Sequence, residues 1–310
     1  MKTLTIFTAP KPFLNQQIAM LQRNAIQSWV QLGTDVEVIL LGNDEGIGET
    51  ARDLRVIHVP DVATNSLGTP LVDSIFKNAR AYGSAETLAY INADILLMDN
   101  FLSSAKLLGK KLSKFLAVGQ RWDLAIGIPL VFSSGWQERL WTDTQKRGRL
   151  HPSGGSDYFI FPRLCFREIP EFSIGRAGWD NWMIYQARQK GWPVVDATPS
   201  IDIIHQDHDY SHLPGGQAHY RLPESNENVR LAGGERNIFT LMDTNYSLNG
   251  KAIHPAKISW KKFLREVEIY PQVSLHSNSL TQLFFAIFHP KKAYHNLRQS
   301  QASKNKNKKR

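Results

Sequence analysis

Short apolar runs alternate with segments of helical periodicity in the first third of the chain. The helical segments, 16–31 and 70–82, repeat their apolar residues every three or four positions, as one face of a helix requires. Such alternation predicts parallel strands joined by crossover helices. The expected strands cover residues 3–7, 36–41, 55–59 and 86–91.

The rest of the chain is less regular, although it still contains strand and helix patterns. We therefore expect an α/β fold with an open mixed sheet, mostly parallel and flanked by helices, whose second half is irregular. The expected helices cover residues 137–146 and a stretch that follows Trp179-Asp180-Asn181-Trp182 and ends at Lys190. The expected strands cover residues 115–119, 158–161, 194–196 and 201–204.

Three of the early strands end in polar or turn-forming residues. Because the carboxyl ends of neighbouring parallel strands meet at one edge of a sheet, this edge is where a nucleotide is expected to bind. An aspartate held there, Asp94, can bind a hard divalent cation, and the cation can bind a diphosphate. A turn or helix-capping role for Asp94 remains the alternative. The three strand ends are Thr8-Ala9-Pro10, Gly42-Asn43-Asp44 and Asn92-Ala93-Asp94.

In their order along the chain, these segments resemble glycosyltransferases of the GT-A fold, of the family 2 type, from about Thr3 to His212. The Asn92-Ala93-Asp94 segment looks like a variant of their DxD motif, with asparagine in place of the first aspartate. The resemblance implies that Asp94 holds Mn²⁺ or Mg²⁺ against the diphosphate of a nucleotide sugar. It also implies that the base and ribose contact Thr8, Ala9, Pro10, Asn43 and Asp44.

The resemblance further implies that a histidine at a later strand end completes the metal site, and His205 and His208 are the candidates. Their spacing matches no closed zinc site, and no cysteine is near. Asn92 can contact ribose or a metal-bound water, but it contributes no charge. We therefore expect a weaker metal affinity than two carboxylates would give.

Candidate acceptor-side residues lie just before the expected helix that ends at Lys190. Asp180 there is a candidate helix N-cap, and the resemblance implies that it also faces the acceptor as the base that takes the hydroxyl proton. Trp179 and Asn181 beside it are candidate substrate contacts, the former as a flat face for a sugar ring. Asp157, after a glycine turn, either binds donor-sugar hydroxyls or stabilises the turn.

The leading hypothesis is a glycosyltransferase of the hexosyltransferase type, with a nucleotide sugar as donor and a glycan, lipid or small-molecule hydroxyl as acceptor. Two alternatives stay open. One is a sugar nucleotidyltransferase, although the first strand is not followed by the glycine-rich phosphate loop of those enzymes. The other is a non-catalytic nucleotide- or sugar-binding relative. This hypothesis stays open because Asn92 replaces the first aspartate of the motif.

The net charge of +9 is concentrated at the C-terminus. Residues 291–310 hold eight Lys or Arg and no acidic residue, so the rest of the chain is nearly neutral and specific nucleic-acid binding is not expected. We expect a catalytic domain over 1–215, with its nucleotide half at about 1–125 and its acceptor half at about 126–215. A C-terminal extension packed on it would cover 216–290, followed by a disordered basic tail.

Compartment and membrane contact can be predicted from few residues. Cys165 is the only cysteine, so no intramolecular disulfide can form and a reducing, cytoplasmic compartment is expected. No apolar run approaches the roughly 18 residues that cross a bilayer. The apolar segment 283–288 and the basic tail predict weak peripheral contact with anionic membrane.

Overall fold

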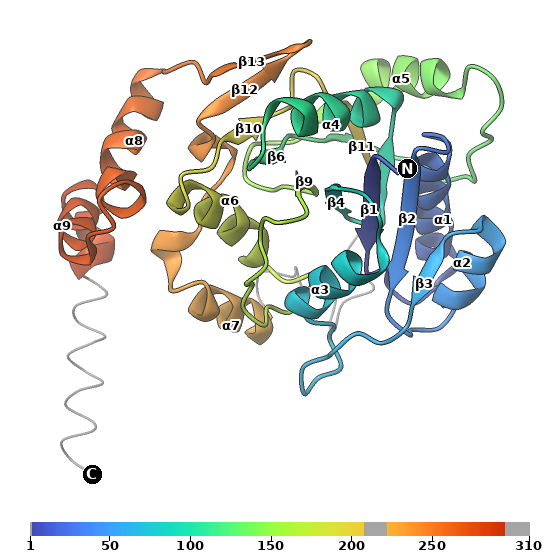
Figure 1. The fold of residues 1–310 in the computed structure, drawn as a ribbon, viewed down its shortest axis with the longest axis horizontal. Coiled ribbons are helices and arrows are strands. Elements are labelled where there is room, and N and C mark those ends of the chain that lie inside the picture. Colours follow the sequence, from blue (N-terminus) through green and yellow to red (C-terminus); the bar gives the residue numbers. More distant parts are fainter. Residues whose placement is uncertain (1, 208–221, 295–310) are drawn as a thin grey trace. The chain divides into compact units, whose positions relative to one another are not determined.

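The computed structural model describes residues 2–207 and 222–294. It divides into two compact units, which we describe separately. The larger unit comprises residues 1–187 and 192–256, and the smaller comprises 188–191 and 257–310 (Figure 1).

The sheet of the larger unit has the strand order β13-β12-β10-β6-β9-β4-β1-β2-β3. In its first half, β4, β1, β2 and β3 are parallel neighbours, as the alternation of strands and helices predicted. Each of these strands lies within a predicted one or exceeds it by a single residue. Their bounds are β1 Leu4–Thr8, β2 Val36–Leu41, β3 Ile57–Val59 and β4 Thr87–Ile91.

The second half of the sheet mixes strand directions. β9 is antiparallel to both β4 and β6, whereas β6, β10 and β12 are parallel and β13 closes the sheet antiparallel. The predicted α/β fold, with an open and mostly parallel mixed sheet flanked by helices, is confirmed. The bounds are β6 Leu116–Val118, β9 Tyr158–Pro162, β10 Val194–Asp196, β12 Tyr246–Asn249 and β13 Ala252–Pro255.

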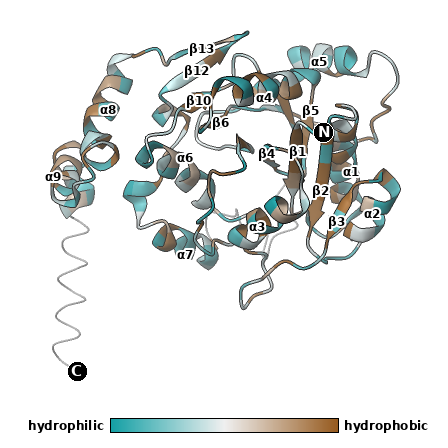
Figure 2. Ribbon diagram, in the orientation of Figure 1, coloured by the Kyte–Doolittle hydropathy of each residue, from teal (hydrophilic) through white to brown (hydrophobic). Residues whose placement is uncertain are grey.

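Alternate residues of the central strands enter two different layers of the core. Leu4 and Ile6 of β1 pack with residues of α1, α2 and α4, whereas Phe7 meets Phe76 of α3 edge-to-face on the other side. Central strands that are apolar on both faces are typical of a sheet covered by helices on both sides (Figures 1 and 2). The bounds are α1 Gln16–Val30, α2 Ile47–Leu54, α3 Val72–Tyr82, α4 Asp99–Lys111 and α6 Trp179–Gln189.

A second, four-stranded sheet has the order β5-β11-β7-β8. In it, β11 is antiparallel to β5 and parallel to β7. The α5 helix packs beside β7 through a small apolar cluster that includes Leu124 and Leu140. The bounds are β5 Ile95–Leu97, β7 Trp122–Leu124, β8 Arg149–Leu150, β11 Ile203–Gln206 and α5 Trp136–Arg147.

The remaining helices follow the gap at 208–221 in the described residues. In the larger unit, β12 and β13 follow them and join the main sheet, although they lie beyond the predicted boundary near residue 215. None of the helices in the described part of the chain is long and apolar enough to cross a membrane. The bounds are α7 Pro223–Leu231, η3 Glu235–Asn237 and η4 Leu241–Asp243 in the larger unit, and α8 Trp260–Val273 and α9 Asn278–Phe288 in the smaller.

The start of α3 differs from the sequence pattern, which predicted a helix over residues 70–82. The N-cap is Leu71, in an extended conformation and without a side-chain capping bond. Pro70 and Leu71 instead form isolated bridges, to Thr64 and Ser173. The extended backbone that these bridges require delays the helix until Val72. Two further differences are α2, which was not predicted, and β11, which covers Ile203–Gln206 and not the predicted 201–204.

Candidate active site

The three predicted strand ends lie at one edge of the main sheet. Thr8 is the last residue of β1 and is buried, while Asn43 and Asp44 follow β2 and are exposed. Asn92 directly follows β4, which pairs with β1 on its other side. Ala9 and Pro10, which follow Thr8, are partly and fully buried respectively. The residues proposed to contact the nucleotide therefore come from three adjacent parallel strands.

The pairing of β5 with β11 brings Asp94 close to His205. Asp94 directly precedes β5, and His205 lies opposite Ile95 in the antiparallel register. The backbone N–H of Gln206 donates to the Asp94 carbonyl oxygen at 3.2 Å. This pairing holds His205 Nε2 3.8 Å from Asp94 Oδ2. The other candidate histidine, His208, lies outside the described residues.

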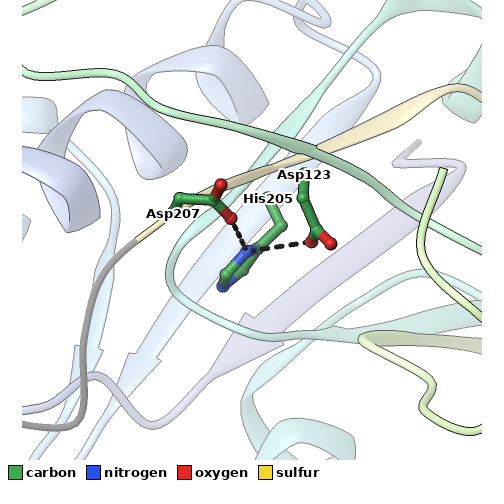
Figure 3. A group of neighbouring side chains, drawn as sticks. All are labelled: Asp123, His205 and Asp207. Atoms are coloured by element: carbon green, nitrogen blue, oxygen red, sulfur yellow. Dashed lines mark ion pairs between the residues drawn. The ribbon is translucent and has the colours of Figure 1, made fainter. Parts of the chain in front are cut away.

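The other neighbour of β11 contributes a second carboxylate to the same histidine. Asp123 of β7 lies opposite His205 in the parallel register, with its Oδ1 3.3 Å from His205 Nδ1. Oδ1 of Asp207 lies 3.4 Å from the same nitrogen, so the imidazole sits between two carboxylates (Figure 3). One ligand atom from each of these three residues lies within 4.8 Å of the others.

Asp123 is itself held by three further cationic or polar side chains. It accepts hydrogen bonds from Arg121 Nε at 2.8 Å and from His151 Nδ1 at 2.7 Å, and Arg149 lies 3.5 Å away. Burial raises the pKa of the Asp123 carboxyl, but hydrogen bonds from His205, His151 and Arg121 together bring it well below its usual range. Asp123 is therefore an ionised acceptor that can fix an Nδ1–H tautomer of His205.

Asp94 and His205 suit a divalent cation. Carboxylate oxygen and neutral imidazole nitrogen are both ligands of Mn²⁺. Ligand atoms about 2.1 Å from a shared ion can lie up to roughly 4 Å apart, so the 3.8 Å between Asp94 Oδ2 and His205 Nε2 allows both to bind it. With Nδ1 held by Asp123, the lone pair of Nε2 is directed away from Asp123. This is the carboxylate–histidine–metal arrangement common in metalloproteins.

Asn92 and Asp157 are linked to each other across the edge of the sheet. The Asn92 side chain donates to Asp157 Oδ1 at 2.9 Å and accepts from the Tyr90 hydroxyl at 3.0 Å. Arg121 Nη1 donates to both Asp157 oxygens at 2.7 Å. Asp157 is buried, and these bonds compensate its charge. The Asn92 amide thus connects a core tyrosine to a buried ion pair.

A partly buried lysine, Lys11, is close enough to Asp94 for the two charges to interact. Burial lowers the pKa of the Lys11 ammonium, the charge of Asp94 raises it and the charge of Arg176 lowers it, with a net lowering. Gln22 of α1 clamps the Lys11 backbone, accepting from its N–H at 2.7 Å and donating to its carbonyl at 2.9 Å. Arg176 is paired with Glu224 at 2.6 Å. Lys11 therefore brings positive charge to the end of β1.

Asp180 lies inside the first turn of α6, not at the predicted N-cap position, because the helix already begins at Trp179. Its carboxylate accepts from the backbone N–H of Gly178 at 3.2 Å. Burial, which backbone hydrogen bonds only partly offset, raises the pKa of Asp180 from its usual 3.8 to about 6, and the charge of Asp157 adds to the rise. Such a carboxyl is a suitable proton acceptor near neutral pH.

The neighbours of Asp180 are engaged in packing. Trp179 is only 4% exposed, and its ring meets Tyr90 edge-to-face at 5.0 Å. The Asn181 side chain donates to the carbonyl oxygen of Phe239 at 2.6 Å. Their roles as substrate contacts stay predictions.

Several members of this site were not predicted from the sequence. Arg121 and Asp123 follow the apolar strand at 115–119, which is the same strand-end signal that singled out Asp94. Lys11 lies between two prolines shortly after the first strand, and this position can also be seen in the sequence. His151 carried no comparable signal, since only the pairing of β7 with β8 brings it to Asp123.

Comparisons with known proteins give structural likenesses only. No family model and no curated protein matches this sequence. One similar structure is a protein of Desulfovibrio desulfuricans G20 assigned as a nucleotide-diphospho-sugar transferase, at 13% identity and a TM-score of 0.42, covering 75% of this chain and 98% of that one.

Two others are the mannosyltransferase PcManGT of Pyrobaculum calidifontis in complex with GDP-Man and Mn²⁺, and S. aureus TarS 1–349 in complex with UDP-GlcNAc. Their identities are 11% and 14%, and their TM-scores are 0.39 and 0.44. The matches cover 65% and 75% of this chain, but only 56% and 65% of those proteins. With every TM-score below 0.5, we transfer no activity from them.

Proposed function

We propose that this protein is a glycosyltransferase that moves a sugar, of the hexosyl type, from a nucleotide-diphosphate sugar to a hydroxyl acceptor with the help of a divalent cation. The observation that carries the proposal is the placement of Asp94 and His205 Nε2, 3.8 Å apart, beside the carboxyl ends of β1, β2 and β4. Ligands of open α/β sheets bind at such an edge.

In this proposal, the donor lies along the three strand ends. Thr8, Ala9 and Pro10 contact the base and ribose together with Asn43 and Asp44. Lys11 and a cation on Asp94 and His205 face the diphosphate. A bound Mn²⁺ or Mg²⁺ would neutralise the negative charge that develops on the departing diphosphate.

Asp180 is the proposed base on the acceptor side. Its raised pKa of about 6 leaves it ionised at neutral pH yet basic enough to accept a proton from a hydroxyl that attacks the sugar. The charges of Asp157 and Asp180 both act on the Tyr90 hydroxyl, which supports their placement around one site. Asp157 is the candidate contact for donor-sugar hydroxyls.

A non-catalytic nucleotide- or sugar-binding protein remains the second candidate. The observation in its favour is that the Asn92 side chain is hydrogen-bonded to Tyr90 and Asp157, so the first position of the motif supplies no charge to a metal. A sugar nucleotidyltransferase is disfavoured because Lys11 is flanked by prolines, with no glycine-rich phosphate loop. The kind of acceptor and contact with membranes stay predictions.

Release of nucleoside diphosphate from a panel of UDP- and GDP-sugars, with Mn²⁺ or with EDTA, tests the proposal. Water can take the place of the acceptor hydroxyl as the nucleophile, so we expect metal-dependent release from at least one donor. The Asp180→Asn variant should bind that donor and release little. Binding of a nucleotide sugar without release, in every acceptor mixture tested, would favour the non-catalytic candidate.

A further inference from the structure

The α9 helix exposes an apolar stripe. Its eleven residues contain no charged side chain, and only Thr281 is buried. Leu280, Leu283 and Ile287 follow the spacing of one helix face, and the last two are 53% and 64% exposed. A stripe of large aliphatic side chains in water is unfavourable unless another surface covers it (Figure 2).

The α8 helix, in the same unit, carries a second exposed stripe. Trp260, Phe263 and Leu264 stand three and four residues apart, so they share one face, and Tyr270 continues it. Trp260 is 73% exposed, and its ring stacks on Phe263 at 5.5 Å. Two of the three buried residues of α8, Ile269 and Val273, lie on the other side of the helix, whereas Pro271 near its end lies on the side of Leu264. α8 is thus apolar on its packed face and on its solvent face.

The charge of the smaller unit is strongly positive. Residues 257–310 hold 12 Lys and Arg but only two acidic residues, which gives a net charge of +10 and leaves −1 for residues 1–256. Both acidic residues are paired: Glu266 with Arg188 at 2.7 Å, and Glu268 with Arg265 at 3.1 Å and with His289 at 2.8 Å. Two carboxylates cannot balance twelve Lys and Arg side chains, so the net charge of this segment stays strongly positive.

We infer that the α8–α9 hairpin, residues 257–294, is a membrane-surface element that lies on anionic phospholipid. Aliphatic side chains on a short helix enter the boundary between headgroups and acyl chains, tryptophan and tyrosine favour that boundary, and lysines bind the negative surface. Exposed Lys257, Lys261 and Lys291 are available for that contact. An acidic protein partner would match the charge, but it would not require aliphatic and aromatic stripes on both helices.

This inference is independent of the proposed transfer reaction, since vesicle binding is measured without nucleotide or metal. The full chain is sedimented with vesicles of equal parts phosphatidylcholine and phosphatidylglycerol, and with pure phosphatidylcholine. We expect binding to the anionic vesicles that weakens at high ionic strength, and little binding to the neutral ones. Equal binding to both kinds would overturn the electrostatic part of the inference.

The chain offers a matched pair of variants on α9. Gln282 and Leu283 are adjacent and both exposed, so Gln282→Glu and Leu283→Glu add the same charge on different sides of the helix. We expect Leu283→Glu to weaken partitioning about tenfold more than Gln282→Glu, with both melting curves unchanged. An equal loss of vesicle partitioning in both variants would show that only the basic residues bind the membrane, and would overturn the role of the apolar stripe. A dimer in solution that only Leu283→Glu dissociates would instead assign the stripe to contact between two copies.

Discussion

His205 and Asp94 face each other with Nε2 and Oδ2 3.8 Å apart, and the hydrogen bond from the Gln206 N–H to the Asp94 carbonyl fixes their separation through the backbone. Asp94, which directly precedes β5, supplies a carboxylate, and His205 of the paired strand β11 supplies an imidazole beside it. Asp123 on the next strand holds the other ring nitrogen. These groups suit a cation site in which a carboxylate on the second ring nitrogen orients the histidine.

Replacing Asp123 tests whether it orients His205. Asp123→Asn removes the negative acceptor of Nδ1–H while nearly keeping the side-chain volume. We expect Mn²⁺ affinity, measured from the electron paramagnetic resonance signal of free Mn²⁺, to fall about 10- to 100-fold. Asp99→Asn, at an exposed carboxylate on α4, is the control and should change nothing. Unaltered Mn²⁺ affinity in Asp123→Asn would remove Asp123 from the site.

The ionisation of Asp180 should control the pH dependence of sugar transfer. Only its ionised form can accept a proton, so kcat/KM should rise with pH around a midpoint of about 6. Asp180→Asn should lower kcat roughly 100- to 10,000-fold and abolish that limb of the profile. A variant that keeps the wild-type profile would exclude Asp180 as the base.

The same carboxyl affects stability with a definite sign. Its folded-state pKa of about 6 exceeds the usual 3.8, so between these values the folded protein binds more protons than the unfolded chain. The contribution of Asp180 to the free energy of unfolding therefore falls as pH rises through this window. Relative to wild type, Asp180→Asn should be more stable at pH 7 than at pH 4, which thermal melting at the two pH values can measure.

Asn92→Asp, which supplies the carboxylate missing from the first position of the motif, is expected to destabilise the protein. The new carboxylate would replace the amide that donates to Asp157 Oδ1, and it would place two negative charges side by side at a buried position. We expect a loss of about 1–3 kcal/mol in the free energy of unfolding, without tighter Mn²⁺ binding. Tighter binding at unchanged stability would show that the asparagine is a weakened metal ligand.

Arg121 should be a principal contributor to the stability of this site. It pairs with both oxygens of Asp157 and with Asp123, all of them largely buried. Arg121→Ala removes the cation paired with Asp157 and one of the hydrogen-bond donors to Asp123, so we expect a loss of about 3 kcal/mol in urea denaturation. Arg147→Ala, which breaks an exposed pair with Asp143, is the matched control and should have no measurable effect.

The first half of the sheet could be predicted because its signals are local. Buried parallel strands appear as apolar runs whose ends are visible in the sequence, so the positions of Thr8, Asn43 and Asp94 at or after strand ends could be predicted. The partners of Asp94 could not be found in this way. Asp123 and His205 reach it only through the register of β5, β11 and β7, which depends on contacts between residues about 80 positions or more apart.

Element boundaries failed where long-range pairing overrides local preference. Thr69 and Pro70 form a good local helix start, yet the bridges of Pro70 and Leu71 keep that backbone extended. Asp180 has the sequence position of a cap, but α6 begins one residue before it. For α3, the long-range bridges decide where the helix begins.

The decisive test of Asp94 as a metal ligand is calorimetric titration of UDP and GDP, each with and without Mn²⁺, into wild type and Asp94→Asn. We expect one nucleotide to bind the wild type much more tightly with Mn²⁺, and Asp94→Asn to lose the metal-dependent part while its melting curve is unchanged. Metal-dependent binding that survives in a folded Asp94→Asn variant would contradict the assignment of Asp94. Binding of neither nucleotide under any condition would contradict the proposed donor site as a whole.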